Sequence, residues 1–588
     1  MILSAKMSYK IVETDIVIVG SEAAGARAAF EAQDQGVDVL VITKSKMAKS
    51  AVTLMAVATC TAPFNEKDSP EILLKDTIKG GSFINDQKLA KIFAEEACQA
   101  VLDYDKYGTN FAKKQDKYVQ FQMPGHTFPR GCLTEPIGTT GRKMVRALRR
   151  EASKRKIKIF EDTLVFSILI NNGRAVGVLA IDLQKTEVLV IKAKATILAT
   201  GGGMRVYENN CAAKEATGDG LAMAYRAGAK LRDMEFVQFF PTVMVSPKNL
   251  FGQQGPTRLR YELNAQLINF YGERFMYRYD PVRGDKSTRD IVARGIYTEV
   301  KEGRGTEHGG VYMDVSYLPD KVVNAFIDRY YPGFDFGGVD LLKEGIDIRK
   351  EPFEVAPAVH FFMGGVVINE ETATGIAGLY ACGEVAGGVH GANRLGGSAL
   401  PEMGVFGRRA GKFAAEYVKD LKGSVEINIE QVNNEIEKIE RLFERTKGPN
   451  VYSILKKLQH TMWQGAFVLR SAQSLDLVLS EIECLHQEYQ NVALNSKSKS
   501  FNLELKTALE LELMFDVTEM IVRAALMRTE SRGAHYREDH PERNDQKWLQ
   551  NIIISRKAVG MQLNKQPVEF TILKPEEGND DKSKNRKN

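Results

Sequence analysis

The most informative stretch of the chain is His390-Gly391-Ala392-Asn393-Arg394-Leu395-Gly396-Gly397-Ser398-Ala399-Leu400. It follows residues 379–384 (LYACGE), a pattern that predicts a buried strand ending in a tight turn. We expect a helix to begin near Ala399. The glycines would then precede a helix N-terminus, where backbone amides and the helix dipole favour negative charge. Arg394 adds a planar guanidinium suited to a carboxylate. The stretch predicts an anion site, although a purely structural turn is the simpler interpretation of Gly396-Gly397.

The N-terminal region has the pattern of a dinucleotide-binding βαβ unit. Residues 14–20 are a β-branched run typical of a buried parallel strand, residues 26–35 have helical composition, and residues 37–42 predict a second strand. The turn Gly20-Ser21-Glu22-Ala23-Ala24-Gly25 keeps the outer glycines of the fingerprint but has Glu22 at the middle one. Because a pyrophosphate would lie over these amides, we expect the Glu22 carboxylate to point away from it.

Bulk properties are those of an ordinary globular protein and favour no nucleic-acid or membrane-spanning function. A chain of 588 residues should divide into about three units. The net charge of +5, from 80 basic and 75 acidic residues, gives no argument for nucleic acid. We find no apolar run of transmembrane length and no signal peptide. The six cysteines stand singly, so we expect no metal or iron–sulfur cluster in this chain and a reducing, cytoplasmic location.

The string HGANRLGG with CGE upstream resembles the flavoprotein subunits of the fumarate reductase and succinate dehydrogenase family, of which L-aspartate oxidase is a close relative. The resemblance covers residues 14–543 and implies an α/β fold: a Rossmann-like FAD-binding domain, an inserted α+β capping domain and a C-terminal helical bundle. On this basis we assign residues 1–245 and 356–424 to the FAD-binding domain, 246–355 to the capping domain and 425–540 to the helical domain. Residues 541–588 form a C-terminal extension, and its charged tail from Lys574 is predicted to be disordered.

Helical patterns within the helical domain cover residues 430–447, 454–489 and 503–527. They resemble the three-helix bundle of the family.

The resemblance implies FAD as the cofactor. Thr43 and Lys44, instead of an acidic residue, follow the second strand; this argues against NAD and is compatible with FAD. Asp219 opens a predicted helix and is equally suited to contact the flavin or to cap the helix. The residues predicted to bind FAD are Gly20, Ser21, Ala23, Ala24, Gly25, Thr43, Lys44, Ser50, Val165, Thr200, Gly201, Gly202, Asp219, Glu384, Ser398, Ala399 and Leu400.

Residue 51 bears on how FAD is held. Respiratory members of the family carry a histidine after the serine that Ser50 resembles, and this histidine bonds covalently to the flavin. Here the residue is Ala51. The resemblance therefore implies noncovalent FAD, as in the aspartate oxidases.

Three residues resemble the reacting groups of the family. Arg394 resembles the arginine that grips one carboxylate of a C4 dicarboxylate, and His360 resembles the histidine that binds the other. Arg289 resembles the proton donor, a role that requires an unusual, dehydrated setting for arginine. Each alone has a structural interpretation, but together, in family order, they predict a substrate site. His126 and His535 are interpreted as structural.

The chain also departs from the family pattern. Phe240, in Gln238-Phe239-Phe240-Pro241, replaces a substrate-binding histidine and cannot donate a hydrogen bond. Thr257, Arg258 and Tyr261 fall where the family has Thr, Glu and Arg. Thr257 is thus a retained substrate-binding candidate, whereas the family's Glu–Arg proton relay is not kept. A pocket that binds fumarate through hydrogen bonds should lose affinity when a donor is lost. The expected substrate is therefore a less polar unsaturated acid, or a related compound with one end at Phe240.

Several functions remain open. The first is the catalytic flavoprotein subunit of a fumarate reductase or succinate dehydrogenase-like complex. Its electrons would pass to a separate iron–sulfur subunit, and any membrane association would be indirect and peripheral. The second, favoured by Ala51, is a stand-alone aspartate oxidase-like enzyme. The third is a flavin electron-transfer subunit whose own substrate chemistry is altered or lost, with an adenylylsulfate reductase-like relative as a further alternative.

Overall fold

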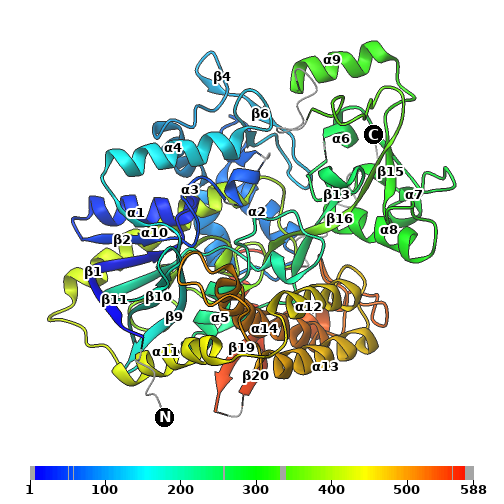
Figure 1. Cartoon of the computed structure of the whole chain (residues 1–588). Coiled ribbons are helices and arrows are strands. Elements are labelled where there is room, and N and C mark those ends of the chain that lie inside the picture. Colours follow the sequence, from blue (N-terminus) through cyan, green and yellow to red (C-terminus); the bar gives the residue numbers. More distant parts are fainter. Residues whose placement is uncertain are drawn as a thin grey trace.

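The computed structural model describes residues 7–50, 52–56, 59–255, 258–331, 340–558 and 560–575. Figure 1 shows an α/β body, a lobe at the upper right that carries α6–α9, and a group of helices at the lower right. This arrangement agrees with the predicted fold class. Ala51, Thr257 and the tail after residue 575 lie outside the described residues. No described helix has the length and apolar character needed to span a bilayer.

The body is built on a mixed sheet. Within the described residues this sheet has seven strands, in the order β8-β2-β1-β11-β10-β9, with β18 beside β11. β8, β2, β1, β11 and β18 pair in parallel, and β9 and β10 add an antiparallel edge. The strands are β1 (Tyr9–Val19), β2 (Val39–Ile42), β8 (Lys158–Phe160), β9 (Thr163–Asn171), β10 (Arg174–Asp182), β11 (Glu187–Leu198) and β18 (Leu379–Ala381). The predicted βαβ unit is confirmed, with β1 beginning earlier than expected.

Two glycines explain the turn between β1 and α1 (Ala23–Asp34). Gly20 has φ +109°, and a Cβ there would lie 2.2 Å from the carbonyl oxygen of Ala199. A Cβ on Gly25 would lie 1.9 Å from the carbonyl oxygen of Gly20. Side chains at these positions would push α1 away from the sheet.

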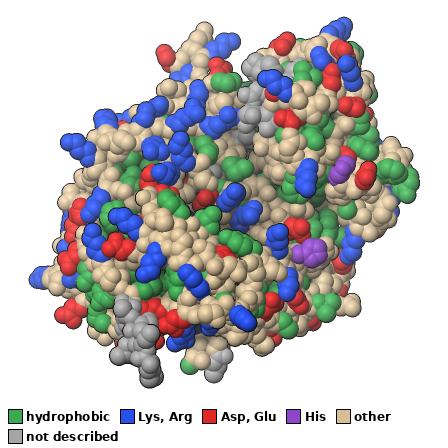
Figure 2. Space-filling model, viewed as in Figure 1, with side chains coloured by type: hydrophobic (Ala, Val, Ile, Leu, Met, Phe, Trp, Pro, Cys, Tyr) green, Lys and Arg blue, Asp and Glu red, His purple; other side chains and the backbone are tan. Residues whose placement is uncertain are grey.

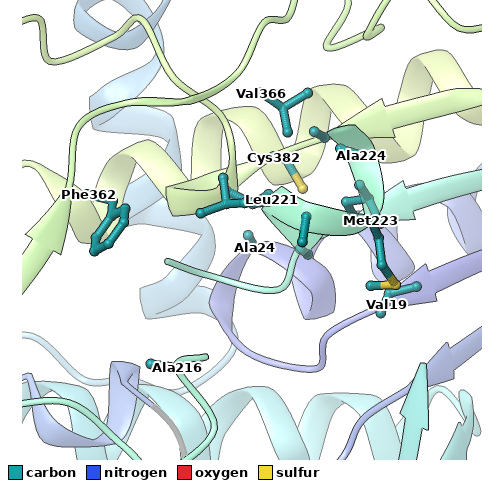
Figure 3. Packing of buried hydrophobic residues seen from close by; sticks show 14 of the residues in the cluster. Val19, Ala24, Ala216, Leu221, Met223, Ala224, Phe362, Val366 and Cys382 are labelled. Carbon is teal, nitrogen blue, oxygen red and sulfur yellow. The ribbon is translucent and has the colours of Figure 1, made fainter. Parts of the chain in front are cut away.

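Small side chains let the layers of the body pack closely. Ala24 on α1 and Cys382 after β18 lie in one apolar cluster with Val19 of β1 and Met223 of α5 (Figure 3). Burying a valine or methionine side chain contributes about 1.5–3 kcal/mol.

The body contains further helices and short strands. The helices are α2 (Pro70–Gly80), α3 (Gln87–Lys106), α4 (Thr140–Lys154), α5 (Asp219–Arg226) and α10 (Ala399–Asp420), and the short strands are β3 (Cys60–Thr61), β4 (Lys113–Lys114), β5 (Lys117–Tyr118), β6 (Gln120–Phe121) and β7 (Gly131–Cys132).

The lobe at the upper right of Figure 1 has its own sheet and apolar core. The sheet order is β13-β16-β15-β14. Its elements are β13 (Val237–Met244), β14 (Gln266–Ile268), β15 (Val311–Asp314) and β16 (Phe353–Phe362), with α6 (Arg258–Glu262), α7 (Met276–Tyr279), α8 (Arg289–Lys301) and α9 (Asp320–Tyr330). β13 and β16 join this lobe to the body, so residues on them lie at the boundary. We call the lobe the cap.

The helical region differs from its prediction in two places. It contains α11 (Ile429–Glu444), α12 (Val451–Gly465), α13 (Ala472–Tyr489) and α14 (Leu503–Met527). The predicted continuous helix over 454–489 is wrong, because the chain breaks between Gly465 and Ala472. Ser471 begins α13 with a capping box to Ser474. α12, α13 and α14 pack together as the bundle, whereas α11 lies against β9.

The segment after the bundle adds strands to the body. After α15 (Asp545–Trp548), β19 (Gln550–Lys557) and β20 (Gly560–Pro567) form a hairpin. β19 pairs with β12 (Leu231–Arg232), which also pairs with β17 (Gly365–Val366). Basic and acidic side chains are interspersed over the face in Figure 2, with basic ones concentrated over the region of α4. This distribution agrees with the near-balanced composition.

Candidate active site

One cavity of about 850 Å³ runs from the β1–α1 turn to the cap. Arg289, His360, Arg394 and Phe240, predicted from separate parts of the sequence, all line it. Of the residues predicted to bind FAD, those that line it are Gly20, Ser21, Ala24, Thr43, Lys44, Ser50, Val165, Thr200, Gly201, Asp219, Glu384, Ala399 and Leu400. Ala23, Gly25, Gly202 and Ser398 are not among the lining residues. The predicted substrate and cofactor residues therefore meet in a single space.

The part of the cavity beside the β1–α1 turn fits FAD. The hydroxyl oxygen of Thr200, which lines the cavity, is buried and has no hydrogen-bond partner among the described residues. Gly201, with φ +74°, leaves its Cβ position open. The Glu22 carboxylate accepts from the amides of Val52 and Thr53 at 2.9 and 2.8 Å. It is therefore engaged with that loop, in keeping with the expectation that it points away from the turn amides.

Lys44 organises the polar wall of this region. Its Nζ donates to Asp219 Oδ2 at 2.6 Å, Glu510 Oε1 at 2.8 Å and Thr217 Oγ1 at 2.5 Å. Burial disfavours the Lys44 charge, but the two carboxylates outweigh burial and raise the pKa of Lys44 above its usual value. Asp219 does not cap α5, because Gly218 occupies that position with φ +82°. The N-cap alternative for Asp219 is wrong, and its carboxylate instead pairs with Lys44.

Two arginines meet at one side-chain amide. Arg394 Nη2 donates to Gln238 Oε1 at 2.9 Å, and Arg289 Nη1 donates to the same oxygen at 3.2 Å. The Gln238 amide donates in turn to Asn393 Oδ1 at 3.0 Å and to the Arg394 carbonyl at 2.8 Å. These bonds fix the Gln238 orientation, so its oxygen faces both cations. Gln238 lies in the quoted 238–241 stretch, but nothing in the sequence pattern singled it out.

Both guanidinium groups are held in a dehydrated setting. Burial, followed by the nearby charge of Arg289, lowers the pKa of Arg394 to about 9. Burial also lowers the pKa of Arg289. Arg394 lies 4.4 Å from the centre of the Phe361 ring, and its Nε has no partner among the described residues. An arginine with a lowered pKa can exchange a proton more readily than one in water.

His360 lines the same cavity as the two arginines. Its Nδ1 is 3.2 Å from Cys211 Sγ, and its ring meets the Phe240 ring edge-on at 5.2 Å. Burial, followed by Arg289 and Arg394, lowers the pKa of His360 well below its usual range. The imidazole is therefore neutral and can offer one N–H to a carboxylate.

Two buried acids, Glu384 and Glu402, lie close enough to Arg394 to affect its charge. Burial raises the pKa of Glu384 to about 7 and that of Glu402 to about 8. Glu384 Oε1 accepts the Phe362 amide at 2.9 Å, whereas Glu402 Oε2 has no partner among the described residues. No sequence pattern indicated Glu402. Its place on α10, which follows HGANRLGG, puts it near Arg394.

Arg258 and Tyr261, at the positions where a proton relay was expected to be lost, have other partners. Arg258 lies between the rings of Phe121 and Tyr330, at 4.3 and 5.1 Å, and pairs with Glu262 at 2.7 Å. Tyr261 lines the cavity, and its hydroxyl lies 3.4 Å from the Ser287 carbonyl. Arg258 is therefore engaged at the cap boundary.

The histidines interpreted as structural have protein partners. His126 Nε2 is 3.0 Å from the Gly396 carbonyl, and its Nδ1 is 3.1 Å from Arg130. His535 lies 2.9 Å from Arg470 and 3.2 Å from the Arg528 carbonyl. His126 thus holds the glycine-rich stretch in place, in agreement with its structural interpretation.

Comparisons with known proteins agree with this geometry. Residues 15–400 match the family model described as FAD binding domain, and residues 455–580 match that described as fumarate reductase flavoprotein C-term. The chain is 40% identical over 94% of its length to a fumarate reductase (CoM/CoB) subunit of Methanothermobacter marburgensis, covering 98% of that protein. The chain belongs to the fumarate reductase and succinate dehydrogenase flavoprotein family.

This flavoprotein also resembles a bacterial succinate dehydrogenase flavoprotein subunit, from Rickettsia bellii, with 32% identity over 97% of this chain and 98% of that one. Among solved structures, Escherichia coli quinol fumarate reductase FrdA gives a TM-score of 0.88 at 29% identity, covering 96% and 98% of the two chains. Adenylylsulfate reductase from Archaeoglobus fulgidus, at 21% identity and a TM-score of 0.78, shares the fold. The protein is an FAD-dependent oxidoreductase of the class that acts on CH–CH bonds, and its cofactor is FAD.

Proposed function

We propose that this flavoprotein is the catalytic subunit of a complex that reduces fumarate or a closely related unsaturated acid. The observation that carries the proposal is the shared contact of Arg289 and Arg394 with Gln238, in the same cavity as His360. Two cations and a neutral imidazole around one space suit a small anionic substrate. The similarity to the fumarate reductase (CoM/CoB) subunit of Methanothermobacter marburgensis supports this substrate.

The chain's own residues divide the work. Arg394, held at Gln238 and over Phe361, would bind one carboxylate. His360 would donate its free N–H to the other end of the substrate. Bound FAD supplies hydride exchange with one carbon of the substrate. Arg289, whose pKa is lowered by burial, would give a proton to the adjacent carbon.

The surroundings of His360 are largely apolar. Cys211, Phe240, Val243 and Ala358 form a separate buried cluster. A carboxylate facing this cluster would have fewer donors than in a pocket with a second histidine, so the proposed substrate class includes acids with one less polar end. The substrate-binding role of Thr257 remains part of the proposal.

We also propose that FAD is held noncovalently and that electrons arrive through a separate iron–sulfur subunit. The described residues contain no cluster of metal-binding side chains, and the cysteines are single. The complex would be cytoplasmic, and any attachment to a membrane would occur through other subunits. Acid precipitation is expected to release all the flavin; flavin that stays on the protein would contradict noncovalent binding.

The decisive experiment is anaerobic reoxidation of the reduced protein. Fumarate is expected to restore the absorbance of oxidised flavin, and crotonate, which has one carboxylate, measures what the second carboxylate contributes. Failure of both acids to oxidise the flavin faster than buffer would overturn the proposed function. Aspartate oxidation with release of hydrogen peroxide would instead support the stand-alone oxidase favoured by Ala51. Co-purification of an iron–sulfur protein would favour the complex.

A further inference from the structure

Cys211 is a buried thiol that directly contacts the imidazole of His360. It follows Asn210 in the loop between β11 and α5, and its amide donates to the Val359 carbonyl at 3.1 Å. Its Sγ lies 3.2 Å from His360 Nδ1 and 3.3 Å from the Val359 carbonyl oxygen. Cys211 is 3% exposed and lines the same cavity as Arg289 and Arg394. The Cys211 thiol therefore has two possible acceptors, His360 Nδ1 and the Val359 carbonyl oxygen. Which of them accepts the S–H determines which ring nitrogen of His360 carries the proton.

The chemistry of the two groups favours one choice. A neutral imidazole has one N–H and one basic nitrogen, whereas sulfur is a weak acceptor. An S–H donated to Nδ1 uses the stronger acceptor, and the Val359 carbonyl keeps the Cys211 amide as its donor. In the reverse arrangement, Nδ1–H would point to sulfur and the nitrogen left for the cavity would carry a lone pair. That lone pair would repel a carboxylate.

The surroundings keep both groups neutral. Burial, followed by Arg289 and Arg394, lowers the pKa of His360 well below its usual range. Burial raises the pKa of the Cys211 thiol to about 12, with Arg289 and Arg394 opposing it and Glu384 adding to it. A thiolate–imidazolium pair is thus disfavoured from both sides. The neutral His360 imidazole carries one proton, on Nδ1 or on Nε2. The hydrogen-bond partner of Nδ1 determines which nitrogen carries it.

The ring is also held in position. Phe240 meets it edge-on, 5.2 Å away at 62°, and no group of the described residues hydrogen-bonds Nε2. We propose that Cys211 is a positioning residue that fixes His360 as the Nε2–H tautomer and so presents a hydrogen-bond donor to the substrate carboxylate. The inference rests on the proposed function for the role of His360, but the tautomer itself can be measured without turnover.

The test combines kinetics with NMR of the protein labelled with ¹⁵N-histidine. In the wild type, the His360 signals are expected to show an unprotonated Nδ1 and a protonated Nε2, and His360→Gln identifies those signals. Cys211→Ala removes the donor and should disturb this pattern, whereas Cys211→Ser keeps an O–H donor and should preserve it. The fumarate KM is expected to rise about fivefold in Cys211→Ala with little change in kcat, which corresponds to a lost net hydrogen bond of about 1 kcal/mol. Cys211→Ser should lie within about threefold of wild type.

Cys98→Ala is the matched control, because the Cys98 thiol bonds the Pro63 carbonyl and does not line the cavity. It should change neither the tautomer nor the KM. A wild-type ring protonated on Nδ1, or a Cys211→Ala variant with unchanged tautomer and KM, would overturn the inference. The expected tautomer in a protein that no enoate reoxidises would support the role of Cys211 in the ring and overturn the proposed function instead.

Discussion

The guanidinium carbon of Arg289 lies 5.3 Å from the centre of the Phe240 ring. An aromatic face attracts a cation, so the ring helps hold Arg289 where burial disfavours its charge. The same ring offers no hydrogen-bond donor to a carboxylate. Phe240 therefore supports the proposed proton donor while making one end of the pocket apolar.

Replacing Phe240 by histidine is expected to lower the fumarate KM by about tenfold, because the site regains a donor for the second carboxylate. Steady-state kinetics with fumarate and crotonate measure the effect. The crotonate KM should not fall, and Phe240→Leu, which adds no donor, should not lower the fumarate KM. Equal gains for both acids would show that pocket size, rather than a hydrogen bond, limits binding.

Arg289→Lys and Arg394→Ala are each expected to reduce the rate of fumarate-driven flavin reoxidation by about 10²–10³-fold. The flavin-to-protein ratio should remain at the wild-type value, because neither side chain belongs to the wall around Lys44. Arg294→Lys is the control on the same helix, since Arg294 lies over the Tyr536 ring at 4.7 Å. Near-normal reoxidation by either site variant would refute its assignment.

The Gln238 contact predicts a pH limit. Because the pKa of Arg394 is lowered to about 9, its positive charge is present below that pH and is lost as the pH rises through it. The kcat/KM for fumarate should fall there. Gln238→Leu removes the shared acceptor and should move the fall to lower pH, whereas Gln238→Glu adds a negative charge and should move it higher. A profile with the same alkaline limit in all three proteins would contradict this account.

Glu402 predicts how stability changes with pH. Burial, with Glu384 adding to it, raises the pKa of Glu402 to about 8. The folded state then keeps a proton that the unfolded chain releases above about pH 4.3, so stability falls between that pH and about 8. Glu402→Gln should remove the part of this pH dependence that Glu402 contributes, which is on the order of a few kcal/mol in the free energy of unfolding. Thermal unfolding at pH 5 and 8.5 measures it, and the half-exposed Glu416→Gln should keep the wild-type slope.

Lys44→Met should destabilise the protein by about 3–5 kcal/mol, because Asp219 and Glu510 would be left buried without their cation. The free energy of unfolding in denaturant measures the loss. Lys46→Met, at a side chain that is 55% exposed, should change it by less than about 0.5 kcal/mol. Equal effects in the two variants would mean that the Lys44 cluster contributes little to stability.

Local patterns predicted much of this molecule. Gly20 and Gly25 indicated the β1–α1 turn, and the periodicity over 503–527 predicted α14 with the bounds that the structure shows. The predicted helix over 454–489 is too long, because the apolar pattern continues across the break between α12 and α13. Ser471 marks that break as the N-cap of α13. A capped break of this kind depends on side-chain hydrogen bonds that hydrophobic periodicity does not report.

The candidate site was predicted one residue at a time, but its connections were not. Gln238 and Arg394 are 156 positions apart, and only the fold brings an amide oxygen between two guanidinium groups. Lys44 and Glu510 are 466 positions apart. Such pairings have no signature in a single sequence, since each partner alone resembles an ordinary polar residue.

The pairing of β12 with β19 has a consequence for biosynthesis. Leu231 of β12 lies opposite Ile554 of β19. More than 300 further residues must therefore be synthesised after β12 before β19 can pair with it. During that interval the nascent protein presents an open backbone edge to other chains. Chaperone protection of the newly made polypeptide would matter most until the hairpin closes it.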